Sequence, residues 1–291
     1  MVKNISISVI VPVYNDEKGL AATLDSLMLQ TYPKEQIEII VVDNGSTDQS
    51  VAVAQTFSGV IVLKENKPGS YAARNTGILT SSHPTLAFLD AECIAHPDWI
   101  SEGIKALKKI QFDGLVGGKV IFTFQKKDNP NLIELYDSIT HLKNKEYVEK
   151  DNFAVTGNMF TSKAVFDEVG LFDDELKSGG DREWGERVSR ANKSVVFADK
   201  ALNYHHARSS IKQLITKTRR VISGLKTIEK NRPTVINQLI PPVKRMSTIL
   251  KNKKLGHFSV RLSLVGLVYF LKLVSAFELL RLGVGYAPER K

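Results

Sequence analysis

Short apolar strands and amphipathic helices alternate through the N-terminal third of the chain, and this alternation restricts the fold more than any other feature of the sequence. The sequence predicts strands over 5–11, 37–42, 60–63 and 85–89, and helices over 17–30, 49–57 and 71–80. Like elements recur at intervals of about 25 residues, a spacing typical of strand–helix–strand units. We therefore predict an α/β fold with a mixed, mostly parallel sheet that is flanked by helices.

Acidic residues follow three of these four strands. Asp16 comes after the first strand, Asp43 after the second, and Asp90 and Glu92 after the fourth. Ligands of such sheets bind outside the carboxyl ends of the strands, where these acids would gather. Asp90 and Glu92 are two positions apart and repel each other unless a cation lies between them. In isolation such a pair more often marks a strand entering a polar turn, but its place among the other acids predicts a ligand site with a divalent cation.

Several other kinds of site are absent from the sequence. There is no glycine-rich dinucleotide fingerprint after the first strand, no Walker loop, and no H-E-x-x-H or G-x-S-x-G motif. A cation held by Asp90 and Glu92 would manage phosphates without a glycine loop. The single cysteine, Cys93, excludes an internal disulfide and agrees with a reducing compartment. The apolar run from Ile5 to Val13 lacks the features of a signal peptide.

Four short motifs follow one another in this part of the chain. They are Val11-Pro12-Val13-Tyr14-Asn15, Val41-Val42-Asp43-Asn44-Gly45-Ser46-Thr47-Asp48, Arg74-Asn75-Thr76-Gly77 and Phe88-Leu89-Asp90-Ala91-Glu92. In this order they resemble the motifs of glycosyltransferase family 2, and four in series over about 80 residues are specific. The resemblance implies the GT-A fold, a nucleotide-sugar donor and inversion of the anomeric centre.

The same resemblance implies which residues bind the donor. Pro12, Tyr14 and Asp43 would line the nucleoside pocket, where Asp43 would accept a hydrogen bond from the edge of the base. Arg74 would lie near the donor phosphates. The other implied donor-binding residues are Asn15, Asp90, Arg208 and Arg220, the last in a segment that closes over the donor in the family.

A divalent cation, Mn²⁺ or Mg²⁺, is also implied, with Asp90 and Glu92 as ligands. The second acid of the family motif is more often aspartate, so the longer Glu92 requires the ion or the carboxylate to shift. His205 and Arg208 match a His-x-x-Arg segment that lies at the metal–diphosphate face in relatives. A neutral imidazole suits Mn²⁺ as a third ligand, although a packed or surface histidine is the alternative reading of His205.

Asp181 begins a predicted helix after Gly179 and Gly180, and in isolation it reads as a helix N-cap. Its position resembles the acidic motif that supplies the catalytic base in the family, where glutamate usually stands in place of Gly180. Inverting transfer needs one carboxylate to take the proton of the acceptor hydroxyl. The resemblance therefore assigns the base to Asp181, with Glu183 as the second candidate. The candidate acceptor-site residues are Gly157, Asn158, Glu183 and Trp184.

The last part of the chain is strongly basic. Residues 201–291 contain 18 Lys and Arg against three acids, whereas residues 1–200 contain 22 basic and 28 acidic residues. We expect a GT-A catalytic domain over 1–205 and a basic helical region over 206–291. This excess of positive charge predicts a partner with an anionic surface, such as lipid headgroups.

The segment 258–282 is apolar apart from four charged residues, Arg261, Lys272, Glu278 and Arg281. Its longest charge-free run is about half of the roughly 20 residues that a spanning helix needs. Lys272 would lie near the bilayer centre, at a cost of about 3 kcal/mol. We therefore predict a helix in the interface on the cytoplasmic side of a membrane, with its cations toward the headgroups. A core helix, a homodimer contact and a membrane span are the alternatives.

The predicted activity is metal-assisted, inverting transfer of a sugar from a nucleotide-diphosphate donor, a UDP-sugar, to a hydroxyl of a glycan or lipid-linked acceptor. A sugar-phosphate nucleotidyltransferase shares the sheet layout but needs an early glycine- and arginine-rich loop, which Pro12-Val13-Tyr14-Asn15 is not. A basic nucleic-acid-binding protein is the non-catalytic alternative. No recognition motif is present and the aromatic residues of the tail lie within its apolar segment, so we expect no nucleic-acid partner.

Overall fold

The computed structural model describes residues 5–127, 129–227 and 233–287. The chain divides into two compact units. Unit 1 comprises residues 1–122, 142–175 and 180–205, and unit 2 comprises residues 123–141, 176–179 and 206–291. The domain boundary expected at 205–206 stays a prediction. In the structure, residues 123–141 and 176–179 group with the C-terminal residues in unit 2.

Unit 1 is built around an eight-stranded sheet with the strand order β3-β2-β1-β4-β7-β6-β8-β5. The strands are β1 (Ile7–Val13), β2 (Ile37–Asp43), β3 (Val60–Lys64), β4 (Thr85–Leu89), β5 (Cys93–Ala95), β6 (Gly114–Thr123), β7 (Asn158–Ser162) and β8 (Ser194–His206). Strands β3, β2, β1 and β4 run parallel, as the strand–helix alternation predicts. β7 is antiparallel to β4 and β6, and β5 is antiparallel to β8. The sheet is therefore mixed, with its parallel half formed by the first four strands.

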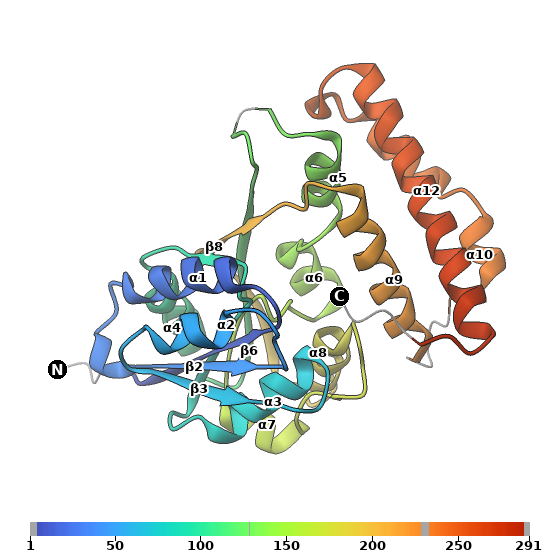
Figure 1. The fold of residues 1–291 in the computed structure, drawn as a ribbon. Helices are drawn as coiled ribbons and strands as arrows, with labels where there is room; N and C mark the ends of the chain where they lie inside the picture. Colours follow the sequence, from blue (N-terminus) through green and yellow to red (C-terminus); the bar gives the residue numbers. More distant parts are fainter. Residues whose placement is uncertain (1–4, 128, 228–232, 288–291) are drawn as a thin grey trace. The chain divides into compact units, whose positions relative to one another are not determined.

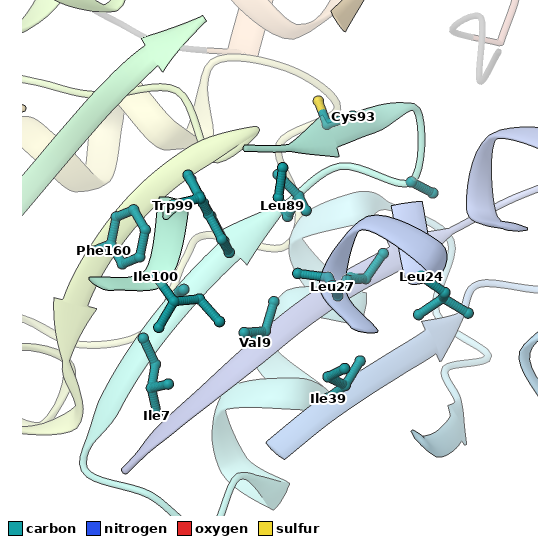
Figure 2. Close-up of a cluster of buried hydrophobic side chains, with 14 of the residues drawn as sticks. Ile7, Val9, Leu24, Leu27, Ile39, Leu89, Cys93, Trp99, Ile100 and Phe160 are labelled. Carbon is teal, nitrogen blue, oxygen red and sulfur yellow. The ribbon is translucent and has the colours of Figure 1, made fainter. Parts of the chain in front are cut away.

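Helices cover both faces of this sheet (Figure 1). They are α1 (Glu17–Met28), α2 (Ser50–Gln55), α3 (Ser70–Thr80), α4 (Trp99–Lys109), α6 (Asn144–Asp151), α7 (Lys163–Val169) and α8 (Gly180–Arg190). On one face Val9 belongs to a core cluster with Leu24 of α1 and Trp99 of α4, as Figure 2 shows. On the other face Val42 packs with Ala73 of α3. Burial on both faces explains why the parallel strands are almost continuously apolar.

Unit 2 is helical and has its own apolar core. Its helices are α5 (Leu132–Thr140), α9 (Ile211–Thr227), α10 (Val235–Leu239), α11 (Val243–Lys251), the short η3 (Lys253–Leu255) and α12 (Phe258–Gly283). α12 packs against α5, α9, α10 and α11. The buried core residues are Tyr136, Leu214, Ile249, Leu255, Leu264, Leu267, Val268 and Leu271. The apolar segment that ends the sequence is therefore partly a core helix.

Two charged positions of α12 are satisfied inside unit 2. Lys272 Nζ donates to the carbonyl oxygens of Asn237 and Ile240, each at 2.8 Å. Glu278 is buried and accepts from Arg281 Nε at 2.9 Å. Protein oxygens thus already bind Lys272 and Arg281, and the expectation that the cations of this helix face lipid headgroups stays a prediction.

Among the described residues, α12 alone is long and apolar enough to cross a membrane, and 44% of its most apolar stretch is buried against the protein. A helix that packs in the core of a soluble protein passes the same test, so this finding is weak support for a span. The remaining face of α12 is apolar and exposed. We call it the α12 stripe, and its residues are Phe258, Leu262, Phe270, Leu273, Phe277 and Leu280.

Candidate active site

The loops that follow β1 and β2 are joined by hydrogen bonds. Val13 and Asp43, the last residues of these strands, are direct neighbours in the sheet. The Asn15 N–H donates to Ser46 Oγ at 2.9 Å, and Asn15 Oδ1 accepts from the Thr47 N–H at 2.7 Å. Asn15 has a φ of 50°, in the left-handed region that asparagine adopts more readily than most residues. The two predicted nucleoside-binding loops therefore form one hydrogen-bonded unit.

Asp43 is buried within this pair of loops. Its carboxylate oxygens accept from the backbone N–H groups of Gly45 and Ser46, each at 3.1 Å. Asp43 thus shapes its own loop, and its contact with a nucleobase stays a prediction. Pro12 and Tyr14 are half-buried on the neighbouring strand end.

Arg74 lies on α3, and its buried guanidinium binds Asp90. Arg74 Nη2 donates to Asp90 Oδ1 at 2.5 Å, whereas Arg74 Nε is buried and has no hydrogen-bond partner among the described residues. A Cβ atom on Gly157 would lie 2.8 Å from Asp90 Oδ2. Gly157 thus clears space for the Asp90 carboxylate, which lies between a guanidinium and a bare stretch of backbone.

Asp181 lies in the first turn of α8, next to these two residues. Its Oδ1 accepts from the backbone N–H of Arg182 at 2.9 Å. Tyr71, also on α3, donates its hydroxyl to the same Oδ1 at 3.4 Å and accepts from the Asp181 N–H at 3.3 Å. α3 therefore supplies a partner for each acid: Arg74 for Asp90 and Tyr71 for Asp181.

The pKa of Asp181 is raised above its ordinary value of 3.8. Burial is the main cause, and the negative charge of Asp90 adds to it. The hydrogen bond from Arg182, the positive charge of Arg74 and the hydroxyl of Tyr71 act in the opposite direction without reversing the shift. A carboxylate with a raised pKa binds a proton more readily than a surface aspartate does, as a general base must.

Glu92, which follows strand β4, is in contact with His205. Cys93 and His205 are paired residues of β5 and β8, and this pairing brings His205 Nε2 within 3.0 Å of Glu92 Oε1. His205 is buried against the Phe122 ring, with the ring centroids 5.5 Å apart. Burial, with the charges of Asp90 and Glu92, raises the pKa of the Cys93 thiol well above its usual range, so this cysteine is a neutral packed residue.

Comparison with known proteins identifies the family. The sequence model described as Glycosyl transferase family 2 matches residues 8–170. Glycosyltransferase AglE of Haloferax volcanii is 40% identical over 223 residues, which are 75% of this chain and 72% of AglE. The chain belongs to glycosyltransferase family 2. Asp181, His205, Arg208 and Arg220 lie beyond the matched residues, so the family match does not test their roles.

One further relative of this family 2 glycosyltransferase and one solved structure are informative. A Methanococcus voltae enzyme, named dolichyl N-acetyl-alpha-D-glucosaminyl phosphate 3-beta-D-2,3-diacetamido-2,3-dideoxy-beta-D-glucuronosyltransferase, is 23% identical over 225 residues, 73% of this chain and 70% of that enzyme. The structure of mannosyltransferase PcManGT from Pyrobaculum calidifontis in complex with GDP-Man and Mn²⁺ superposes with a TM-score of 0.63 at 15% identity. It covers 98% of this chain and 77% of PcManGT. This likeness confirms the predicted GT-A fold.

The predicted metal ligands of the glycosyltransferase do not all converge. Within the described part of the chain, no three His, Cys, Asp or Glu side chains lie close enough together to hold an ion. Glu92 and His205 are nevertheless a preformed pair of oxygen and nitrogen donors, a combination that Mn²⁺ accepts. Asp90, the third donor, is engaged by Arg74 in this structure. The donor types thus fit a divalent cation.

Three residues predicted for the acceptor site have structural partners instead. Asn158 is fully buried, accepts from Trp99 Nε1 at 2.8 Å, and donates to the carbonyl oxygens of Lys119 and Ala201. Trp184 is also fully buried and stacks on Phe166, with the ring centroids 4.4 Å apart. Both side chains are thus packed in the core, and their acceptor-site roles stay predictions. Glu183 forms a two-point ion pair with Arg187, at 2.8 and 2.9 Å.

Arg208 and Arg220 belong to unit 2. The Arg208 backbone N–H and its Nη1 both donate to Asp137 Oδ2, at 3.0 and 3.2 Å. Arg220 lies on α9, half-buried. Their donor-binding roles stay predictions.

Sequence reasoning missed Tyr71. It marks Tyr71 only as the start of a helix, because its partner Asp181 is 110 positions away. One signal was available: Tyr71 lies three residues before Arg74, so the two share a helix face.

Proposed function

We propose that this family 2 glycosyltransferase moves a sugar with inversion from a nucleotide-diphosphate donor to a hydroxyl of a glycan or lipid-linked acceptor, with Asp181 as the general base. The observation that carries the proposal is the setting of Asp181. Its carboxylate has a raised pKa and lies beside the Arg74–Asp90 pair, at the carboxyl ends of the parallel strands. Of the two candidate bases, Asp181 is the better one, because Arg187 holds Glu183 at both carboxylate oxygens.

In the proposed reaction the acceptor oxygen attacks the anomeric carbon of the donor sugar. The hydroxyl proton passes to a carboxylate oxygen of Asp181 as the new bond forms. The bond between the anomeric carbon and the diphosphate oxygen breaks, and that oxygen keeps the electron pair. Attack from the face opposite the leaving group inverts the anomeric centre.

Positive charge is needed where the nucleoside diphosphate leaves. Arg74 would supply part of it from α3. A divalent cation, Mn²⁺ or Mg²⁺, would be held by Glu92, His205 and Asp90, and when bound it neutralises the charge that develops on the leaving diphosphate. The complex of PcManGT with GDP-Man and Mn²⁺ supports a nucleotide-sugar donor and a cation for this fold. For this chain we propose a UDP-sugar, bound at the Asn15 and Asp43 loops.

A donor panel tests the activity. The purified full chain is incubated with UDP- and GDP-sugars, Mn²⁺ or Mg²⁺ and a membrane extract as acceptor, and release of nucleoside diphosphate is measured. We expect release from one donor class, which a chelator abolishes. Glu92→Gln should raise the cation concentration needed for half-maximal rate, whereas the exposed Glu35→Gln should not. No release from any donor, or full release in chelator, would contradict the proposal.

We further propose that unit 2 attaches peripherally to an anionic membrane surface on the cytoplasmic side. Two exposed features of this unit support it: the apolar α12 stripe, and a group of basic side chains on α11 and η3. The exposed basic residues are Lys244, Arg245, Lys251, Lys253 and Lys254. Apolar burial combined with attraction to anionic headgroups is how interfacial helices bind. The name of the Methanococcus voltae relative, which includes a dolichyl phosphate, supports a lipid-linked acceptor.

Co-sedimentation with anionic liposomes tests this attachment. Phe277→Ser and Leu280→Ser remove exposed apolar surface from the stripe and should lower binding severalfold. Leu79→Ser, at an exposed leucine of unit 1, is the matched control and should bind as the parent chain does. Equal binding by all three variants would contradict the proposal. Loss of a dimer without loss of liposome binding would instead assign the stripe to a homodimer contact.

A further inference from the structure

We propose that Tyr71 is a positioning residue for Asp181, and that Gly180 is a glycine because it must leave room for the Tyr71 ring. The proposal rests on the assignment of Asp181 as the general base. It adds two residues to that assignment.

The Tyr71 hydroxyl holds Asp181 at two points. It accepts from the Asp181 backbone N–H at 3.3 Å and donates to Asp181 Oδ1 at 3.4 Å. One hydroxyl thus joins the main chain and the carboxylate of the same residue, which restricts the side-chain rotamer of Asp181. Both distances are long for such bonds, and catalytic hydrogen bonds commonly tighten once substrate is bound.

The Tyr71 ring is itself held in place. Only 6% of the residue is exposed, and its ring centroid lies 5.7 Å from that of Phe172. The guanidinium of Arg74, one helical turn later, lies 5.6 Å from the ring centroid. The hydroxyl is therefore carried by a rigid support, which is what alignment of a base requires.

Gly180 lies against the same ring. A Cβ atom at Gly180 would come within 2.8 Å of the Tyr71 ring atoms Cε2 and Cζ. Gly180 begins α8, where alanine is otherwise well tolerated, so the close approach of the ring explains the glycine. Tyr71 and Gly180 are therefore complementary in size, and we expect a larger residue at position 180 to displace the Tyr71 ring.

The first test removes the hydroxyl and keeps the ring. Tyr71→Phe should lower kcat about tenfold and leave the donor KM within about twofold, because the base loses its alignment while the donor pocket is untouched. Tyr32→Phe is the matched control, since the Tyr32 hydroxyl also makes one accepting and one donating bond to a single residue, Ile5, away from the site. It should leave both constants unchanged. An unchanged kcat in Tyr71→Phe would overturn the proposal.

The second test measures coupling between the two positions. Gly180→Ala should lower kcat in the parent chain, but should have little further effect in Tyr71→Leu, where no ring remains to be displaced. Additive losses would overturn the pairing. Asp181→Asn separates failure of the proposed base from failure of the proposed positioning role. If it retains activity, the proposed base is wrong. If it abolishes transfer while Tyr71→Phe is fully active, only the positioning role fails.

Discussion

Asp137 in unit 2 is fully buried and Asp181 in unit 1 is half-buried, and their surroundings differ. Asp137, on α5, is fully buried and accepts from His141 Nδ1 at 2.8 Å, from the Arg208 backbone at 3.0 Å, and is 3.5 Å from Lys217 Nζ. Asp181 has the hydrogen bond from its neighbour Arg182 and the long one from the Tyr71 hydroxyl.

The pKa values of the two acids move in opposite directions. Burial on its own would raise the pKa of Asp137, but the hydrogen bond from His141 and the charges of Lys217 and Arg208 lower it well below its ordinary 3.8. For Asp181, burial prevails and the pKa is raised. The contrast separates a structural acid, which stays ionised and holds three segments of unit 2 together, from one that is prepared to take up a proton.

The largest difference should appear in stability. Asp137→Asn leaves several cationic groups without their carboxylate and should lower the free energy of unfolding by about 3 kcal/mol. Asp181→Asn should change it by less than about 1 kcal/mol, or raise it, because burying an ionised group with a raised pKa opposes folding at neutral pH. Chemical denaturation of both variants at pH 7 measures this, and an equal loss in the two would remove the distinction.

The next-largest effect should appear in the pH dependence of stability, which the cluster around Asp137 and His141 should produce. Burial, with the charge of Lys217, lowers the pKa of His141 from its ordinary 6.5 to about 4, although Asp137 acts in the opposite direction. The unfolded chain therefore binds a proton below pH 6.5 that the folded chain refuses until about pH 4, so stability falls across this window as pH falls. Since 28% of the His141 side chain is exposed, we expect a loss of only about 2 kcal/mol.

A comparison of denaturation curves at pH 7 and pH 4.5 checks the effect of His141. His141→Gln cannot take up the proton and should show a flatter pH dependence than the parent chain. If the parent and the variant lose stability alike, the acid sensitivity arises elsewhere, and the cluster around Asp137 is not its source.

The smallest effect is expected at Glu183. This residue forms a half-buried two-point pair with Arg187 within one helix, so Glu183→Gln should cost about 0.5 kcal/mol of stability and leave kcat within about twofold. Steady-state kinetics beside a melting curve would show both. A loss of kcat as large as that expected of a base would instead favour Glu183 over Asp181.

The parallel half of the sheet could be predicted because local signals, apolar runs and helical periodicity, determine it. The sequence also placed Arg74 on a helix and Asp90 and Glu92 just after a strand, as the structure does. The pairing of β7 with β4 and β6 could not be predicted in this way, because it joins segments far apart in the chain.

The direction of individual side chains could not be predicted either. Asn158 and Trp184 lie within family-like segments, but their side chains turn into the core, where packing and buried polar partners decide their direction. Tyr71 shows the opposite case. It stands outside the quoted motifs, and folding brings it to Asp181 across 110 positions.

Turnover and donor binding by Asp181→Asn test the central claim most directly. The amide is nearly the same size as the carboxylate but cannot accept the proton of the acceptor. With the donor found in the panel, kcat should fall about a thousandfold while the donor dissociation constant stays within about threefold of that of the parent chain. A variant that transfers sugar within tenfold of the parent rate, with donor binding intact, would contradict the assignment of Asp181 as the base.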